Sequence, residues 1–196
     1  MSKKRKLVIA GLIVAVLVVA WIIVARNCPN AGLALTNNQA TLHRLKNRTT
    51  IPAETDFDLN ASLDALLQPG DDRERWSNTR AARIQGHVID VEYARPEATN
   101  CFNLCRRDIH ILLARQAGAA KNQHVVVEVT PRFQNEVWSE KNLQTKLVGH
   151  WVEFEGWLYF DVDHADQAEN TAAGNPSNWR ATAWEIHPVT RIAVVR

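Results

Sequence analysis

Alternating apolar and polar positions begin near residue 82 and predict five β-strands in the second half of the chain. The strands are expected at about 82–93, 107–115, 124–130, 150–161 and 180–195. Between the third and the fourth, residues 138–147 have the apolar spacing of a short helix, with Ser139 as a suitable N-cap. Five strands with one helix in this position are typical of the OB-fold, a small, partly open Greek-key barrel. We therefore expect a mainly β, OB-like five-stranded barrel, and other five-strand arrangements share the same order.

The fourth expected strand has two different faces. Its apolar positions Val152, Phe154, Leu158 and Phe160 alternate with outward positions that include Trp157 and Tyr159. Aromatic side chains on the outside of an OB-like barrel are typical of sites that stack bases or sugars. The alternative is that the N-terminal helix or the long loop covers these rings as a second small core. We favour it because the sequence shows no strongly basic groove of the kind that single-strand binding requires.

The first half of the chain is organised around an uninterrupted apolar run of 19 residues, Leu7 to Ala25. That length suits a helix that crosses a hydrocarbon core of roughly 30 Å. The four basic residues at positions 3–6 predict a cytoplasmic N-terminus. We expect a single-pass anchor in the cytoplasmic membrane, with the domain in the periplasm or the extracellular space. A cleaved secretory signal is the alternative, and the length of the run favours the anchor.

These patterns divide the chain into four parts. Residues 1–26 form the basic N-terminus and the transmembrane anchor, and residues 27–55 are polar without sustained periodicity and are expected to be a tether. Residues 56–80 contain a leading amphipathic helix, over about 56–67, and the turn that ends it. The OB-like domain is expected over 81–196.

The net charge of +2 excludes a strongly basic protein. The basic residues at positions 3–6 exceed that surplus by themselves, so the remainder is slightly acidic. A nucleic-acid-binding surface requires a concentrated basic face, and a nucleic-acid partner is therefore less favoured. In an oxidising compartment Cys101 and Cys105 are candidates for a disulfide, with two free thiols as the alternative. A metal site is less favoured because a Cys-x3-Cys pair lacks the two further ligands that zinc requires.

Two carboxylate–histidine pairs are the first candidates for chemistry. Asp108 and His110 lie two residues apart in the second strand, as do Glu185 and His187 in the fifth. A carboxylate beside an imidazole supports general acid–base catalysis or orients a metal-binding histidine. Each pair alone is more often a structural hydrogen bond. A catalytic site requires both pairs and the long loop to meet at one pocket.

The connection between the fourth and fifth strands is long enough to suggest function. It contains Asp161 and His164, which together with His187 are candidate metal ligands. A solvated polar loop pinned by Trp179 is the alternative and the more common state of such a segment. Ligand-binding candidates are the two guanidinium groups suited to an anion and the aromatic side chains nearby. They are Arg132, Trp157, Tyr159, Trp179 and Arg180.

Several segments resemble an uncharacterised family of bacterial membrane-anchored or exported OB-like proteins. The likeness covers roughly residues 63–195. The segments are Leu-Leu-Gln-Pro-Gly-Asp-Asp-Arg (66–73), Arg-Asp-Ile-His-Ile (107–111), Val-Glu-Val-Thr-Pro-Arg (127–132), Glu-Gly-Trp-Leu-Tyr-Phe-Asp (155–161) and Trp-Arg-Ala-Thr-Ala-Trp-Glu-Ile-His-Pro-Val-Thr (179–190). The resemblance implies no activity, because none is assigned to the family. It directs attention to Asp108 and His110, to the 161–164 loop and to the Trp-Glu-Ile-His-Pro run, and its match around the cysteines is loose.

Three functions fit these observations. The first is a membrane-anchored, extracytoplasmic OB-like binding module for a small ligand, peptide or glycan near Glu185 and the 161–179 loop. The second is a metal-assisted, nuclease-like hydrolase that uses the Asp, His and Glu side chains. The third is a structural domain that its anchor presents to a protein partner. The sequence identifies no cofactor and leaves open whether the protein is an enzyme.

Overall fold

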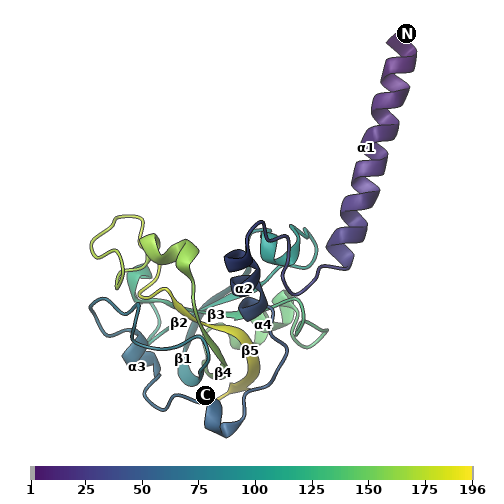
Figure 1. Ribbon diagram of the computed structural model, residues 1–196. Coiled ribbons are helices and arrows are strands. Elements are labelled where there is room, and N and C mark those ends of the chain that lie inside the picture. The colour runs from purple at the N-terminus through teal and green to yellow at the C-terminus, as the bar shows by residue number, and fades with distance from the viewer. Residues whose placement is uncertain (1–2, 196) are drawn as a thin grey trace.

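A closed five-stranded barrel forms the centre of the protein. The computed structural model describes residues 3–195, without the side chains of residues 3, 4, 6–8, 10 and 17. The strands run in the order β1-β2-β3-β5-β4 around the barrel (Figure 1). They are β1 Ala81–Tyr93, β2 Ile109–Ala114, β3 Val125–Val129, β4 Trp151–Phe160 and β5 Trp184–Val194. The α-helices are α1 Lys3–Arg26, α2 Asn37–Lys46, α3 Leu63–Leu66 and α4 Glu140–Leu147.

The strand pairing explains how one long strand closes the barrel. The first half of β1 pairs antiparallel with β4, and its second half pairs antiparallel with β2. β3 and β5 pair in parallel at Val127 and Ile186, and β4 and β5 pair antiparallel. With α4 between β3 and β4, this arrangement fits the OB-like barrel that the sequence predicts.

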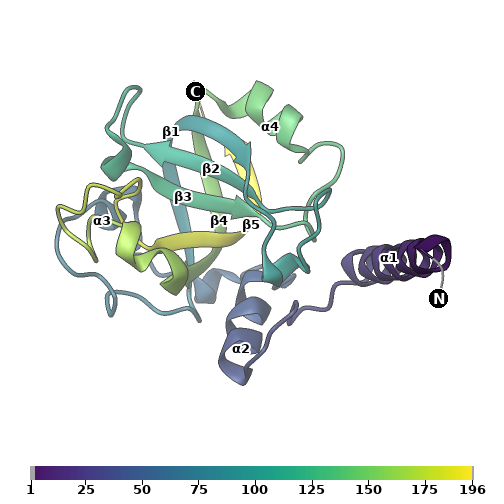
Figure 2. The ribbon, with the colours of Figure 1, turned by 90° about the horizontal axis from the view of Figure 1, so that it is seen from above.

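Alternating side chains of the strands fill the barrel interior. Val152, Phe154 and Leu158 point inward, as the pattern predicts, with the isoleucines of β2 and Ile186. Gly156 is required where β4 crosses β5, because a Cβ there would collide with the carbonyl oxygen of Pro188. The helix α4 packs Leu143 and Leu147 against the same core, at one end of the barrel (Figure 2).

The region expected to be a tether is folded. Residues 37–46 form α2, in which Thr36 is the N-cap and accepts a hydrogen bond from the Gln39 amide. Figure 1 shows α2 beside the barrel, at the base of the projecting α1. The prediction of a tether over 27–55 was wrong because this polar helix lacks the apolar periodicity that the sequence analysis required.

The expected helix over 56–67 is shorter in the structure. Only Leu63–Leu66 is α-helical, with Ser62 as the N-cap. Phe57 instead bridges to Ala81 and packs against Trp157. The amide of Asn60 donates to Asp58 Oδ1, so a local turn replaces the first helical turns.

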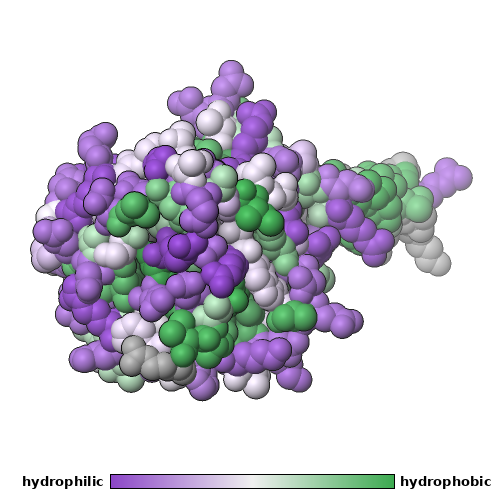
Figure 3. Space-filling model, turned by 90° about the horizontal axis from the view of Figure 1, so that it is seen from below, coloured by the Kyte–Doolittle hydropathy of each residue, from purple (hydrophilic) through white to green (hydrophobic). Residues whose placement is uncertain are grey.

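Among the described residues, no helix combines the length and apolar composition needed to cross a membrane. Several side chains of the run over 7–25, those of residues 7, 8, 10 and 17, lie outside the described part of the chain. Figure 3 shows apolar side chains gathered on the projecting helix and smaller apolar patches on the barrel. The membrane anchor and the single-pass localisation remain predictions from the sequence.

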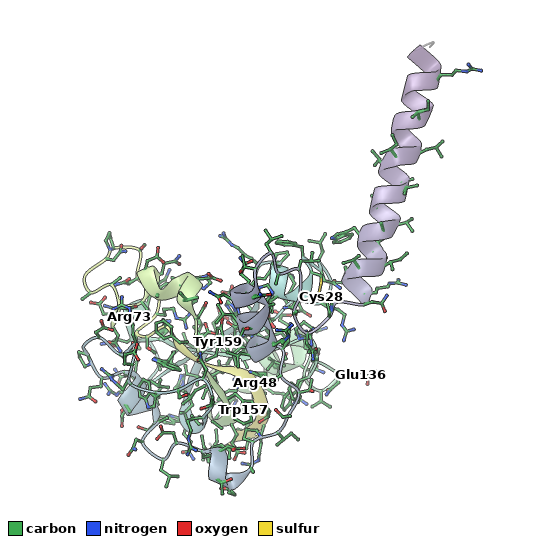
Figure 4. The ribbon with its side chains drawn as sticks, viewed as in Figure 1. Cys28, Arg48, Arg73, Glu136, Trp157 and Tyr159 are labelled. Carbon is green, nitrogen blue, oxygen red and sulfur yellow. A yellow bond between two sulfur atoms is a disulfide. The ribbon has the colours of Figure 1, made fainter. Side chains whose placement is uncertain are left out.

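The disulfide joins Cys28 to Cys101 and not Cys101 to Cys105. Cys28 lies where α1 meets the folded domain (Figure 4), and the Cα atoms of Cys28 and Cys101 are 5.7 Å apart. Cys105 is exposed and free. The predicted pairing was wrong because the segment from Ala98 turns Cys101 inward, where it is fully buried, while Cys105 stays at the surface.

Loss of this disulfide should lower stability substantially. The bond closes a loop with a sequence separation of 73 residues, and such a loop restricts the unfolded chain. We expect the double variant Cys28→Ser/Cys101→Ser to lose about 2–5 kcal/mol of unfolding free energy in urea titrations. The matched control Cys105→Ser should stay within about 0.5 kcal/mol of the parent chain. Equal stability of all three chains would contradict the expectation.

Candidate functional site

A cluster of charged side chains lies on the outer face of the barrel, between the strands and the N-terminal segment. Asp108 directly precedes β2, and His110 follows on that strand. His110 pairs across the sheet with Glu128 of β3. β5, next to β3, contributes Glu185 and His187. These residues share a face because their strand neighbours point into the core.

His187 is the centre of the cluster. Its Nδ1 lies 3.2 Å from Glu128 Oε2 and 3.4 Å from Glu185 Oε2, and its Nε2 lies 3.7 Å from Asp108 Oδ1. The second oxygen of Glu128 lies 3.0 Å from His110 Nε2. The carboxylates and His187 are at most 2% exposed. The two carboxylate–histidine pairs of the sequence therefore meet in one place.

A second set of ion-pair contacts connects the cluster to the long loop between β4 and β5. Arg180 donates from Nη1 to Glu185 Oε1 at 2.7 Å, and the same nitrogen lies 3.4 Å from Asp161 Oδ2. Asp161 Oδ2 lies 2.6 Å from His164 Nδ1. The loop begins a 3-10 helix, Val162–Gln167, directly after Asp161, and this turn brings His164 back over the carboxylate. All three functional features predicted from the sequence thus belong to one network.

The end of α2 covers the cluster. Lys46 is 5% exposed, donates to Glu97 Oε2 at 3.0 Å and lies over the ring of Tyr159. Asn47 follows and accepts a hydrogen bond from Arg132 Nη1 at 2.6 Å. The segment that appears polar and featureless in the sequence therefore supplies a buried cation to the carboxylates.

The charges of the cluster determine one another's protonation. Burial lowers the pKa of His187, but the nearby carboxylates of Glu128, Asp108 and Glu185 outweigh it and raise the pKa to about 10. The pKa of His110 is raised to about 9 against the same burial effect, chiefly by Glu128. Burial opposes ionisation of Glu185, yet Arg180 and His187 hold its pKa well below the usual range. Glu185 is therefore charged and needs positive partners.

A cleft of about 560 Å³ opens beside the cluster. It is lined by Glu92, Tyr93, Ala94, Arg95, Glu97, His110, His164, Gln167 and Trp179. The Trp179 indole is parallel to the His110 ring at 6.3 Å and perpendicular to the His164 ring at 5.9 Å. The two histidines, and Glu97 through its contact with Lys46, connect the network to this cleft.

The predicted ligand-binding residues have different positions. Trp179 lines the cleft, whereas Arg180 is buried behind it. Arg132 binds the carbonyl oxygens of residues 28 and 29 as well as Asn47, and so it fixes the N-terminal segment. Trp157 and Tyr159 are 9% and 2% exposed.

The prediction that Trp157 and Tyr159 bind ligand is not supported, because the N-terminal segment covers both. The Trp157 indole donates to the Thr50 carbonyl at 2.8 Å, and Arg48 lies over its ring. Figure 4 shows Arg48, Trp157 and Tyr159 grouped beside the chain that leaves α2. They form the covered second core that the sequence analysis gave as the alternative to a binding surface.

Two members of the cluster were missed in the sequence. Glu128 interrupts a run of valines in β3, and a lone acidic residue in a buried strand was the available signal. Lys46 lies in the supposed tether, and nothing in its local sequence distinguishes it from a solvated lysine. Among the described residues, the group suited to a metal ion consists of Asp108, Glu128 and His187, with ligand atoms within 4.8 Å of one another. The predicted ligands Asp161 and His164 lie outside that group.

The fold and the site together define an OB-like barrel with a buried acidic cluster and an adjoining polar and aromatic cleft. Comparison with known proteins finds no family model, curated protein or solved structure that matches this chain. The resemblance to an uncharacterised bacterial family therefore stays a prediction.

Removal of Arg180 should be far more damaging than removal of an exposed arginine. Arg180 is 1% exposed and pairs with two buried carboxylates, so Arg180→Met leaves their charges uncompensated. We expect a loss of about 3–5 kcal/mol of unfolding free energy. Arg191 pairs with Glu153 and Glu155 at the surface, where water screens the charges, and the control Arg191→Met should lower stability far less than Arg180→Met. Similar losses in urea titrations would refute a structural role for the buried pairing.

The His164–Asp161 contact should make stability depend on pH. The hydrogen bond with Asp161 raises the pKa of His164, so the folded state binds the proton more tightly than the unfolded chain. This contribution is complete below the unfolded pKa of about 6.5 and is lost as the pH rises through the folded value. The stability difference between the parent chain and His164→Gln should therefore shrink between pH 5 and pH 9. The exposed His150→Gln variant is the control, and a constant difference for His164→Gln would contradict the expectation.

Proposed function

We propose that the chain is an extracytoplasmic OB-like binding module that holds a short glycan in the cleft beside the charged cluster. The composition of the cleft is the observation that carries this proposal. Its lining combines the aromatic rings of Tyr93 and Trp179 with polar side chains whose planar end groups can form hydrogen bonds. A volume of about 560 Å³ is within the range of small-molecule sites.

The chemistry of the lining suits a sugar. A sugar ring has apolar C–H faces, which pack on aromatic rings, and hydroxyl edges, which need donors and acceptors. Arg95 supplies donors, Glu97 supplies acceptors and Gln167 supplies both. A strongly basic groove for nucleic acid is not part of this lining, since Glu92 and Glu97 oppose Arg95.

The cluster supports the cleft by fixing its histidines. Glu128 holds His110 and Asp161 holds His164, and both carboxylates are buried. Side chains that are already ordered lose less conformational entropy when a ligand binds. The buried network is therefore a rigid support for polar groups that face the ligand.

We further propose that the domain is presented outside the cytoplasm by the N-terminal helix. The apolar run over 7–25 and the basic residues at positions 3–6 support this placement. The Cys28–Cys101 disulfide also supports it, because stable disulfides are typical of exported proteins.

A metal-assisted hydrolase is the second candidate, favoured by the convergence of both carboxylate–histidine pairs with the loop. In that function His110, which contacts the inner carboxylates and lines the cleft, would transfer protons at the substrate. The carboxylates themselves are too deeply buried to touch a substrate in the cleft. Binding therefore fits the geometry better than hydrolysis does.

Binding should depend on the aromatic walls of the cleft. We would titrate the full chain with N-acetylglucosamine, its disaccharide and glucuronate by isothermal calorimetry at pH 7. Tyr93→Ala and Trp179→Ala should each weaken binding by about five- to 150-fold, as the loss of a stacking contact worth about 1–3 kcal/mol predicts. Arg115→Ala, which lies on a separate cleft, is the control and should leave affinity unchanged. Absence of binding, or equal affinity of all variants, would contradict the proposal.

A further inference from the structure

We propose that Asp108, Glu128 and His187 form a binding site for one divalent transition-metal ion, behind the cleft. These three residues come from the start of β2, from β3 and from β5. One ligand atom of each lies within 4.8 Å of the others. The inference is independent of the glycan, because the ligands do not line the cleft.

The first argument is the concentration of unpartnered polar atoms. Among the described residues, eight buried side-chain nitrogen or oxygen atoms lack a hydrogen bond. Three of the eight are Asp108 Oδ1, Glu128 Oε2 and His187 Nε2. Asp108 Oδ1 lies 3.7 Å from His187 Nε2, and Glu128 Oε2 lies 3.2 Å from His187 Nδ1, but neither contact forms a hydrogen bond. Buried polar atoms without hydrogen bonds are costly and rare, and one ion bound among these side chains would satisfy them. Asp108 Oδ1 and His187 Nε2 are 3.7 Å apart, and one ligand atom of each of the three residues lies within 4.8 Å of the others.

The second argument is charge. The fully buried carboxylates of this network are Asp108, Glu128, Asp161 and Glu185, and the buried permanent cations are Lys46 and Arg180. With neutral histidines, two negative charges are left over, and burial of an uncompensated charge is strongly unfavourable. One divalent cation would balance them. Protonated histidines would also balance these charges, so the test must distinguish a bound metal ion from protonation of the histidines.

The third argument is the set of contacts behind the ligands. Asp108 Oδ2 accepts a hydrogen bond from Asn100, and Glu128 Oε1 is held by His110. His187 Nδ1 contacts Glu185 Oε2 at 3.4 Å and Glu128 Oε2 at 3.2 Å, and His187 Nε2 faces Asp108 Oδ1 at 3.7 Å. Metal-binding histidines usually donate their other nitrogen to such a carboxylate, and contacts of this kind orient the atoms that bind the metal. Each ligand is therefore held by a residue that does not itself need to bind the metal.

The donor set selects the kind of ion. One imidazole and two carboxylates suit Zn²⁺, Mn²⁺ or Fe²⁺, whereas Ca²⁺ and Mg²⁺ prefer oxygen ligands alone. The free thiol of Cys105 is exposed and is not part of the cluster.

The test uses the full chain after treatment with EDTA and dialysis. At pH 7.5 we expect isothermal calorimetry and elemental analysis to give about one equivalent of Zn²⁺ or Mn²⁺, and no binding of Ca²⁺. Metal binding should also raise the Tm of the parent chain, because the ion binds only the folded state. Absence of Zn²⁺ and Mn²⁺ binding at millimolar concentration would overturn the proposal and leave a protonated His187 as the partner of the carboxylates.

Variants locate the ion. Asp108→Asn and Glu128→Gln keep the shape of each ligand but remove its charge, and each should weaken metal binding at least tenfold and abolish the Tm rise. Asp72→Asn is the matched control, because Asp72 is a fully buried carboxylate with an unpartnered oxygen outside the site. It should retain the metal. Undiminished binding by Asp108→Asn and Glu128→Gln would overturn the proposal in favour of surface sites.

A second experiment applies if either variant fails to fold, as judged by circular dichroism. Bound Mn²⁺ should broaden the NMR signals of His187 in the parent chain, and unbroadened signals would overturn the proposal.

Discussion

The structure depends on the neutralisation of carboxylates that are buried on the outside of a barrel. Four acidic side chains lie out of reach of water, and an isolated buried carboxylate is strongly unfavourable. Arg180 and Lys46 come from segments that are far apart in the sequence. Arg180 lies in the β4–β5 connection, and Lys46 is at the end of α2. The cluster therefore fixes both segments against the barrel. Its contacts specify how the parts fit together, while the apolar core supplies most of the stability.

The same constraint explains why the cleft lies where it does. The loop after β4 is held to the barrel by Asp161, Arg180 and His164, and its far end brings Trp179 beside His110. The cleft walls thus come from segments whose positions are set by buried charges. Loops held in this way present binding groups with little freedom, as a recognition site requires.

The barrel was predictable because its information is local. The alternation of apolar and polar residues identifies β4, and the helical spacing of apolar residues before it identifies α4. Neither pattern requires knowledge of a tertiary contact. From the sequence, we could say only that a site requires the two carboxylate–histidine pairs to meet. Whether Asp108 and His110 lie near Glu185 and His187 depends on the order of the strands in the barrel. The parallel pairing of β3 with β5 brings the residues together, and no single strand contains that information. The lone acidic position of Glu128 among valines was visible in the sequence, but its partners became clear only through the same pairing.

The parts that could not be predicted are those whose stability is not local. α2 is polar, and its sequence signal was the Thr36-x-x-Gln39 cap at its start. Such a short helix is marginal in isolation. It persists because Lys46 enters the acidic cluster, Asn47 binds the Thr99 carbonyl, and the Cys28–Cys101 bond fixes the chain on either side of them. The disulfide was mispredicted for the same reason. Cys101 and Cys105 are four residues apart, which suggests a local loop. The observed bond instead joins Cys101 to Cys28, because the N-terminal segment folds over the cluster.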